Sequence, residues 1–133
     1  MEAANVTRTG VILAVADVPR SVSWYRDHLG FELEASFDDP PYAILALGGT
    51  RLSLAEQGHD AEDRPGVTMV APGDRSRVQA CLVLEVTDCR GAYERLGAEG
   101  VEFLAEPFSP PWGGARVFAV DPDGYPVELE QPA

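Results

Sequence analysis

Few side chains in this sequence are suited to acid, base or nucleophilic chemistry. Glu128 lies in an apolar run near the C-terminus, where a carboxylate can accept a hydrogen bond from a ligand or act as a general base. Ser53 lies between two leucines, and no histidine is placed to activate its hydroxyl. Cys81 begins an apolar run, where we expect a buried, unactivated thiol. Glu128 therefore either binds a ligand or pairs with an arginine, Arg51 or Arg116.

Aromatic side chains offer a different chemistry, which is stacking on a planar ligand. Trp112 lies in a loop rich in proline and glycine, where the indole either covers a ligand or packs at a sheet edge or dimer contact. Phe37 and Tyr42 flank an acidic, proline-rich turn, where they either face a ligand or form a local hydrophobic contact. Phe108 precedes Trp112 in the same loop. Phe118 lies in the next strand, and the pattern does not determine which face of the sheet it is on.

The elements that must position these side chains follow from the hydrophobic pattern. Asp17 is expected to cap a helix over residues 19–29, and Gly30 is expected to end it. The helix carries apolar residues at steps of three and four, which is typical of one buried face. Strands are predicted around this helix, over residues 11–15, 31–36, 42–47 and 51–55.

The same order returns in the second half of the chain. Asp17 matches Asp88 at an offset of 71 residues, and Gly30 matches Gly100 at an offset of 70. A second helix is expected over 90–99. The accompanying strands are expected over 82–88, 101–104, 115–120 and 126–130.

The repeat predicts an α+β fold with two tandem βαβββ modules in a single domain over residues 1–133. The modules are expected over about residues 9–56 and 80–131. Residues 57–79 lack periodicity and are expected to form a long linker, with one short strand at 67–70.

Composition excludes several classes of function. All ten basic residues are arginines, so Schiff-base, pyridoxal-phosphate and Walker A lysine chemistry is excluded. The formal net charge of −12 disfavours nucleic acids and anionic membranes as partners, and it attracts cationic ligands. Cys81 and Cys89 are expected to be reduced thiols of a cytoplasmic protein. We expect no signal peptide, because Met1 to Thr9 hold no apolar region of the needed length, and no run of about 20 apolar residues occurs in this sequence.

Two separated segments resemble the vicinal oxygen chelate superfamily. These segments run from Val15 to Phe31 and from Asp121 to Leu129, and the likeness covers nearly the whole chain. The superfamily includes glyoxalase I, extradiol dioxygenases, fosfomycin-resistance enzymes and bleomycin-resistance proteins. The resemblance implies modules whose sheets curl into a cup-shaped mixed sheet, with helices on the convex side and a ligand in the hollow. It also implies a homodimer.

Metal-dependent members of this superfamily carry ligands at four strand positions. The resemblance places four residues there: Gly10, Ser53, Cys81 and Glu128. A catalytic zinc or iron site needs three ligands of the His, Cys, Asp or Glu type, and only Glu128 is a good one. His28 and His59 fall on the first helix and in the linker, as solvent-facing residues. We therefore expect no metal and no cofactor.

The resemblance is closest to the metal-free antibiotic-binding members. If the four strand positions face the cup, their aliphatic neighbours face the helices. The expected ligand-binding residues are Phe37, Tyr42, Ile44, Ser53, Cys81, Phe108, Trp112, Phe118 and Glu128. They favour a non-catalytic protein that sequesters an aromatic or polycyclic natural product of the bleomycin, mitomycin or enediyne type. The alternatives are a metal-free or unusual lyase, isomerase or dioxygenase-like enzyme using Glu128 or Cys81, or a metal enzyme with ligands elsewhere.

Overall fold

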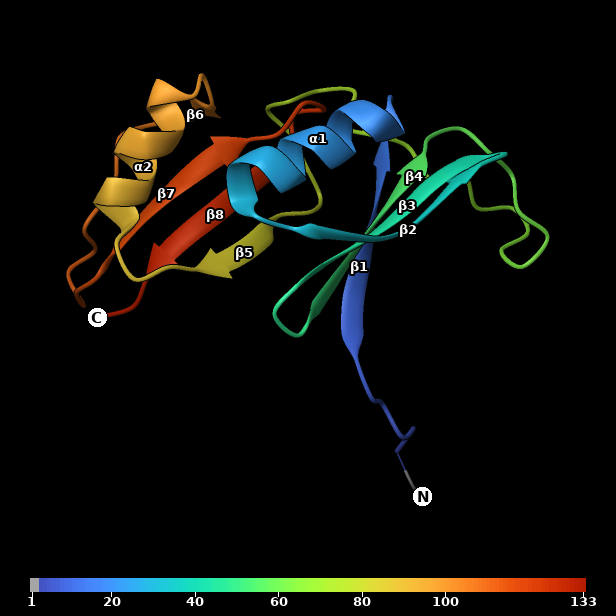
Figure 1. Ribbon diagram of the computed structural model, residues 1–133, viewed down its shortest axis with the longest axis horizontal. Helices are drawn as coiled ribbons and strands as arrows, with labels where there is room; N and C mark the ends of the chain where they lie inside the picture. The colour runs from blue at the N-terminus through green and yellow to red at the C-terminus, as the bar shows by residue number, and fades with distance from the viewer. Residues whose placement is uncertain (1–2) are drawn as a thin grey trace. The chain divides into compact units, whose positions relative to one another are not determined.

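The computed structural model describes residues 3–133, which divide into two compact units. The first unit runs to Ala71 and the second from Pro72 to Ala133. Each unit has one helix and one four-stranded mixed sheet (Figure 1). The predicted α+β fold with two βαβββ modules is therefore confirmed, and the modules form two separate sheets.

In the first unit, β1 (Thr9–Val15) is followed by helix α1 (Val18–Leu29) and three antiparallel strands. These strands are β2 (Glu32–Asp38), β3 (Pro41–Leu47) and β4 (Thr50–Glu56). The sheet order is β1-β4-β3-β2, and β1 pairs with β4 in parallel. The first strand of the module therefore lies beside the last one.

The second unit repeats this arrangement. Strand β5 (Leu82–Glu85) leads into helix α2 (Cys89–Ala98), and then come β6 (Glu102–Phe103), β7 (Ala115–Val120) and β8 (Pro126–Gln131). The order is β5-β8-β7-β6, with β5 parallel to β8. Strands β5 and β6 are shorter than predicted. Beyond their ends, the Val86 amide still donates to the Glu130 carbonyl at 2.8 Å, and the Leu104 amide donates to the Phe118 carbonyl at 2.9 Å.

Local capping explains where the helices begin. The Asp17 carboxylate accepts a hydrogen bond from the Arg20 amide at 3.0 Å, and Asp88 does the same for Gly91 at 3.0 Å. Gly30 ends α1 with a φ of 80°, a conformation that favours glycine. The predicted cap and stop of the first helix are thus confirmed.

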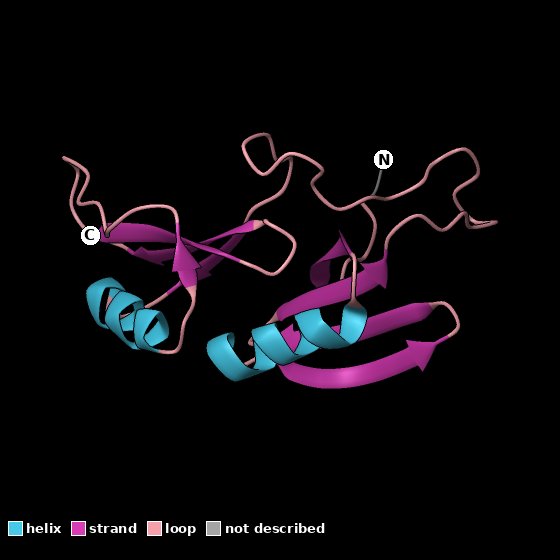
Figure 2. Cartoon of the chain, turned by 90° about the horizontal axis from the view of Figure 1, so that it is seen from above, coloured by secondary structure: helices cyan, strands magenta, loops and turns pink. Residues whose placement is uncertain are grey.

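Each helix covers one face of its own sheet, and the other face carries no helix of that unit (Figure 2). Six of the predicted helix-facing residues are buried: Leu13, Val15, Leu52, Leu54, Val127 and Leu129. Val11, which was expected on the same side, is 38 % exposed. Side chains alternate across a strand, so the residues between them lie on the uncovered face. We call these the open faces of the first and second units.

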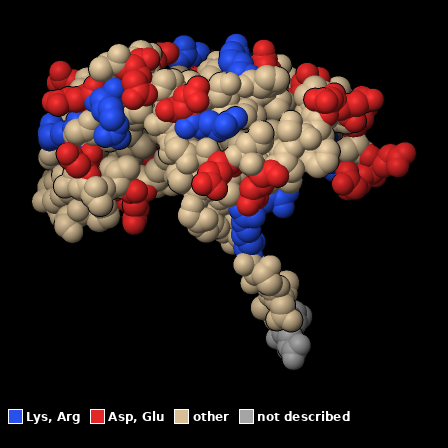
Figure 3. Space-filling view, viewed as in Figure 1, with Lys and Arg blue, Asp and Glu red and all other residues tan. Residues whose placement is uncertain are grey.

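The segment after β4 contains no strand, so the short strand expected at 67–70 is not formed. The Gly58 amide instead donates to the Met69 carbonyl at 3.0 Å, and the Ala71 amide donates to the Gln57 side chain at 3.0 Å. These isolated bonds hold the segment without a ladder. Acidic side chains gather over this end of the first unit (Figure 3). Neither helix among the described residues is long and apolar enough to cross a membrane.

Candidate functional site

The open face of the first unit brings four of the sequence-predicted site residues together. Phe37 pairs with Tyr42 across β2 and β3, and their ring centroids lie 6.3 Å apart at 49°. Ile44 pairs with Ser53 across β3 and β4 in the next row of the ladder. An aromatic pair therefore lies beside a row of smaller side chains, which leaves space over the sheet.

Ser53 is 1 % exposed, and its hydroxyl accepts a hydrogen bond from Arg51 Nε at 3.3 Å. A nucleophilic serine needs a neighbouring base to take its proton. Its hydrogen-bond partner is instead a guanidinium, which only donates. Ser53 is therefore a buried polar group on the open face and does not have the surroundings of a nucleophile.

The open face of the second unit is organised around Glu128. Phe118 on β7 pairs directly with Glu128 on β8, so the side of the sheet that Phe118 faces is now determined. Arg116, two residues earlier, lies on the same face and forms an isolated bridge with Phe108. Val83 on β5 pairs with Glu128 from the other side and is exposed. We call Phe108, Arg116, Phe118 and Glu128 the arginine–glutamate cluster.

The arginine–glutamate cluster combines an ion pair with two aromatic rings. Glu128 is 8 % exposed, and its carboxylate lies 3.7 Å from the Arg116 guanidinium. Of the two arginines considered from the sequence, Arg116 is the partner. The guanidinium lies 6.0 Å from the centroids of both the Phe108 and the Phe118 rings. The arrangement offers a hydrogen-bond acceptor beside two aromatic rings and a cation, which suits a planar ligand that carries a polar group.

Cys81 precedes β5 and is placed next to the cluster. Desolvation raises the pKa of its thiol, the Glu128 backbone N–H lowers it in part, and the Glu128 carboxylate raises it again. The residue as a whole is exposed. A raised pKa keeps the thiol protonated at neutral pH, so Cys81 lacks the thiolate that nucleophilic chemistry requires.

Trp112 and the two histidines belong to neither of these groups. Trp112 is in the turn before β7 and is 73 % exposed. Phe108, in the same loop, reaches the cluster. His28 packs edge-on against Trp24 on α1, with ring centroids 5.7 Å apart, and His59 pairs with Glu56 at 2.6 Å. Neither histidine lies in a strand of an open face, which agrees with the sequence analysis.

The four positions implied as metal ligands do not fit a metal ion. Gly10 offers no donor, and a Cβ there would lie 2.6 Å from the Arg51 carbonyl oxygen. The Ser53 hydroxyl is bonded to a guanidinium, whose positive charge opposes a second cation beside it. Within the described part of the chain, no three His, Cys, Asp or Glu side chains are grouped to hold a metal. These positions therefore lack the donor set of a zinc or iron site.

The sequence offered Arg116 only as one of two partners for Glu128, and it gave no sign that Arg51 lines a hollow of about 240 Å³ with the start of β1. The signal for Arg116 was present, because Arg116 and Phe118 are two residues apart and therefore share a face. The register of the β7–β8 hairpin then brings both to Glu128. Nothing local to Arg51 indicates its surroundings, since these come from the pairing of β4 with the distant β1.

Comparisons with known proteins agree with this architecture. Residues 7–129 match the family described as the Glyoxalase/Bleomycin resistance protein/Dioxygenase superfamily. Uncharacterized protein YetH of Bacillus subtilis is 31% identical over 122 residues, covering 91% of this chain and 94% of that protein. Lactoylglutathione lyase of Salmonella typhimurium is 29% identical over 126 residues, covering 89% of this chain and 87% of the lyase.

A solved structure gives a closely similar backbone. TnmS3, described as an antibiotic binding protein from Streptomyces sp. CB03234, superposes with a TM-score of 0.74 and 23% sequence identity. The match covers 99% of this chain and all of TnmS3 (100%). At this identity the likeness establishes a shared fold.

Proposed function

Because the chain belongs to the Glyoxalase/Bleomycin resistance protein/Dioxygenase superfamily, we propose that it binds an aromatic natural product and sequesters it unchanged. The observation that carries this proposal is the arginine–glutamate cluster. In it a nearly buried carboxylate is paired with Arg116, whose guanidinium lies 6.0 Å from the centroids of two phenylalanine rings. The likeness in fold to an antibiotic binding protein also supports a binding function.

The chemistry of the cluster suits recognition of a planar molecule with a hydrogen-bond donor. Phe118 and Phe108 supply ring surface, and aromatic contacts contribute about 0.5–1.5 kcal/mol beyond the burial of area. Glu128 accepts the donor, while Arg116 offsets the cost of holding a carboxylate away from water. Trp112, exposed on the loop that carries Phe108, supplies a further ring for a ligand that extends over this loop.

The open face of the first unit supports the same function. Phe37 and Tyr42 form an aromatic pair, and Ile44 and Ser53 continue the face. The open face of each unit therefore carries aromatic side chains beside polar ones. We include a homodimer and a cytoplasmic location in the proposal, the latter because both cysteines are free.

An enzyme that uses Glu128 is the second candidate. It is favoured by the position of this carboxylate on an open face beside the Cys81 thiol, and by the sequence likeness to a lyase. A general base contributes only where a substrate proton lies within hydrogen-bond reach. The two candidates differ in the fate of the bound molecule: a binding protein returns it intact, and an enzyme returns a product of altered mass.

Titration of the ¹⁵N-labelled protein with bleomycin, mitomycin C and an anthraquinone tests where binding occurs. We expect at least one of these molecules to shift the amide signals of β7 and β8 around Phe118 and Glu128. Helices α1 and α2, on the covered faces, serve as internal controls and should move little. Shifts confined to the helices, or no shift with any member of the panel at millimolar concentration, would contradict the proposal.

A further inference from the structure

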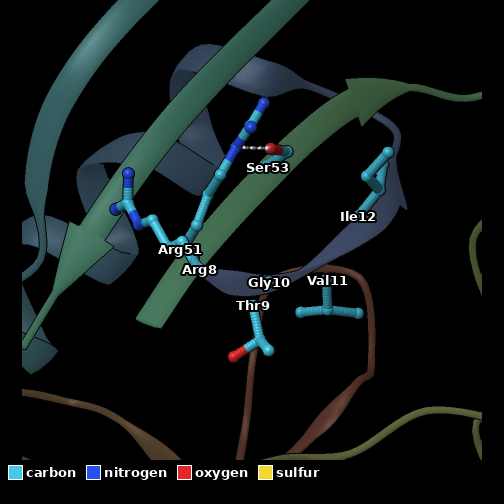
Figure 4. A pocket seen from close by; sticks show the side chains of 7 residues that line it. All are labelled: Arg8, Thr9, Gly10, Val11, Ile12, Arg51 and Ser53. Carbon is cyan, nitrogen blue, oxygen red and sulfur yellow. Dashed lines mark hydrogen bonds between the residues drawn. The ribbon is translucent and has the colours of Figure 1, made fainter. Parts of the chain in front are cut away.

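A hollow of about 240 Å³ lies on the first unit, between the start of β1 and the adjoining part of β4. Its lining includes two arginines, Arg8 and Arg51, in a chain whose formal net charge is −12. Figure 4 shows Arg8, Arg51 and Ser53 directed to the same side of the sheet, while Thr9 and Val11 turn to the opposite side. The open face of the first unit thus has a locally positive end.

The two arginines differ in whether a carboxylate neutralises the charge of their guanidinium group. The Arg8 guanidinium pairs with the Glu34 carboxylate at 3.1 Å. Arg51 donates through Nε to the Ser53 hydroxyl at 3.3 Å, and no carboxylate of the described residues is paired with it. One guanidinium of the hollow therefore retains an unmatched positive charge, with its terminal nitrogens available as donors.

Gly10 creates the space beside this guanidinium. It pairs with Arg51 across β1 and β4, and a Cβ at this position would lie 2.9 Å from the Arg51 Cβ. Any larger residue would push against the base of the arginine side chain. The absence of a side chain at Gly10 therefore keeps the hollow open next to Arg51.

We propose that this hollow binds a carboxylate group of the ligand, so that the bound natural product is an aromatic acid. This inference rests on the proposed function, because the aromatic part of the ligand is assigned to the open face of the first unit. The Arg51 fork matches a carboxylate in geometry, and the Ser53 hydroxyl lies beside it. Ile12, exposed next to Ser53, gives apolar contact to the ring that bears the acid.

Charge matching favours a single negative charge over a phosphate dianion. Arg8 is offset by Glu34, which leaves one uncompensated cation in the hollow. The surrounding protein is strongly acidic, and its field opposes each additional negative charge on a ligand. A carboxylate monoanion matches the one free guanidinium.

The test compares 2-naphthoate with its neutral amide, 2-naphthamide, by isothermal titration calorimetry. We expect the acid to bind at least about tenfold more tightly, as charge-assisted hydrogen bonds of this kind provide. Arg51→Gln should abolish the preference, and Arg51→Lys should restore part of it. Arg26→Gln, on helix α1, changes the net charge equally and should keep the preference. The Arg51 Hε–Nε signal should shift with the acid in the unmodified protein.

The outcomes separate the two proposals. Equal affinity for acid and amide would overturn the carboxylate site and leave the proposed function in place. An equal loss with Arg26→Gln would attribute the preference to the overall field, which also overturns the site. Tighter binding of 2-naphthyl phosphate than of naphthoate would overturn the assignment to a monoanion. If neither naphthyl probe binds, the carboxylate site is rejected, and the titration with the antibiotic panel decides the proposed function separately.

Discussion

Replacing Phe118 with alanine is expected to weaken the binding of an aromatic ligand at least about tenfold, because removal of a central aromatic contact costs about 2 kcal/mol or more. Phe118 pairs with Glu128 and lies beside the Arg116 guanidinium, so it combines ring surface with the polar groups of the cluster. The measurement is the dissociation constant of the panel member that binds, determined by calorimetry.

Phe118→Leu is the matched control for this prediction. Leucine keeps much of the apolar volume but has no ring, so it should lose part of the affinity and leave the fold unchanged. Circular dichroism checks the fold of both variants. If Phe118→Ala binds as tightly as the unmodified protein, the ligand does not contact the cluster, and the proposed site in the second unit is wrong.

Replacing Gly10 with alanine is expected to lower the free energy of unfolding by about 1–3 kcal/mol, the cost typical of forcing extra atoms into a packed region. The added Cβ would meet the Arg51 carbonyl oxygen at 2.6 Å, and backbone atoms cannot swing aside as a flexible side chain can. The strands β1 and β4 must separate to admit it. Urea unfolding followed by circular dichroism measures the change.

Gly49→Ala, in the turn before β4, provides the comparison within the same unit. A Cβ at Gly49 meets nothing within 4 Å, so its effect should stay within about 0.5 kcal/mol. Equal stability of the Gly10 and Gly49 variants would show that β1 and β4 do not approach as closely as described.

Most of the architecture was predictable because its signals are local and repeated. The Asp17 and Asp88 caps, the Gly30 stop and the apolar runs each depend on a few neighbouring residues. Because the module occurs twice, its order of elements could be recognised in both halves of the chain. The short strand expected at 67–70 failed because an apolar run forms a strand only where a ladder partner exists.

The candidate site was less accessible from the sequence, since it depends on pairing between distant strands. Phe118 could not be assigned to a face until the β7–β8 register placed it opposite Glu128. Trp112 drew attention as a large ring on a rigid loop, yet the structure leaves it 73 % exposed, and Phe108 of the same loop reaches the cluster. The hollow at Arg51 arises from the β1–β4 pairing, which local composition does not reveal.

The central claim, that the chain holds an aromatic molecule without changing it, is tested most directly by native mass spectrometry after prolonged incubation with the panel. We expect a complex whose added mass equals that of the intact ligand, on a species of twice 14.3 kDa, with the same ligand recovered after denaturation. A recovered product of altered mass, formed more slowly by the Glu128→Gln variant, would contradict the account and identify the protein as an enzyme.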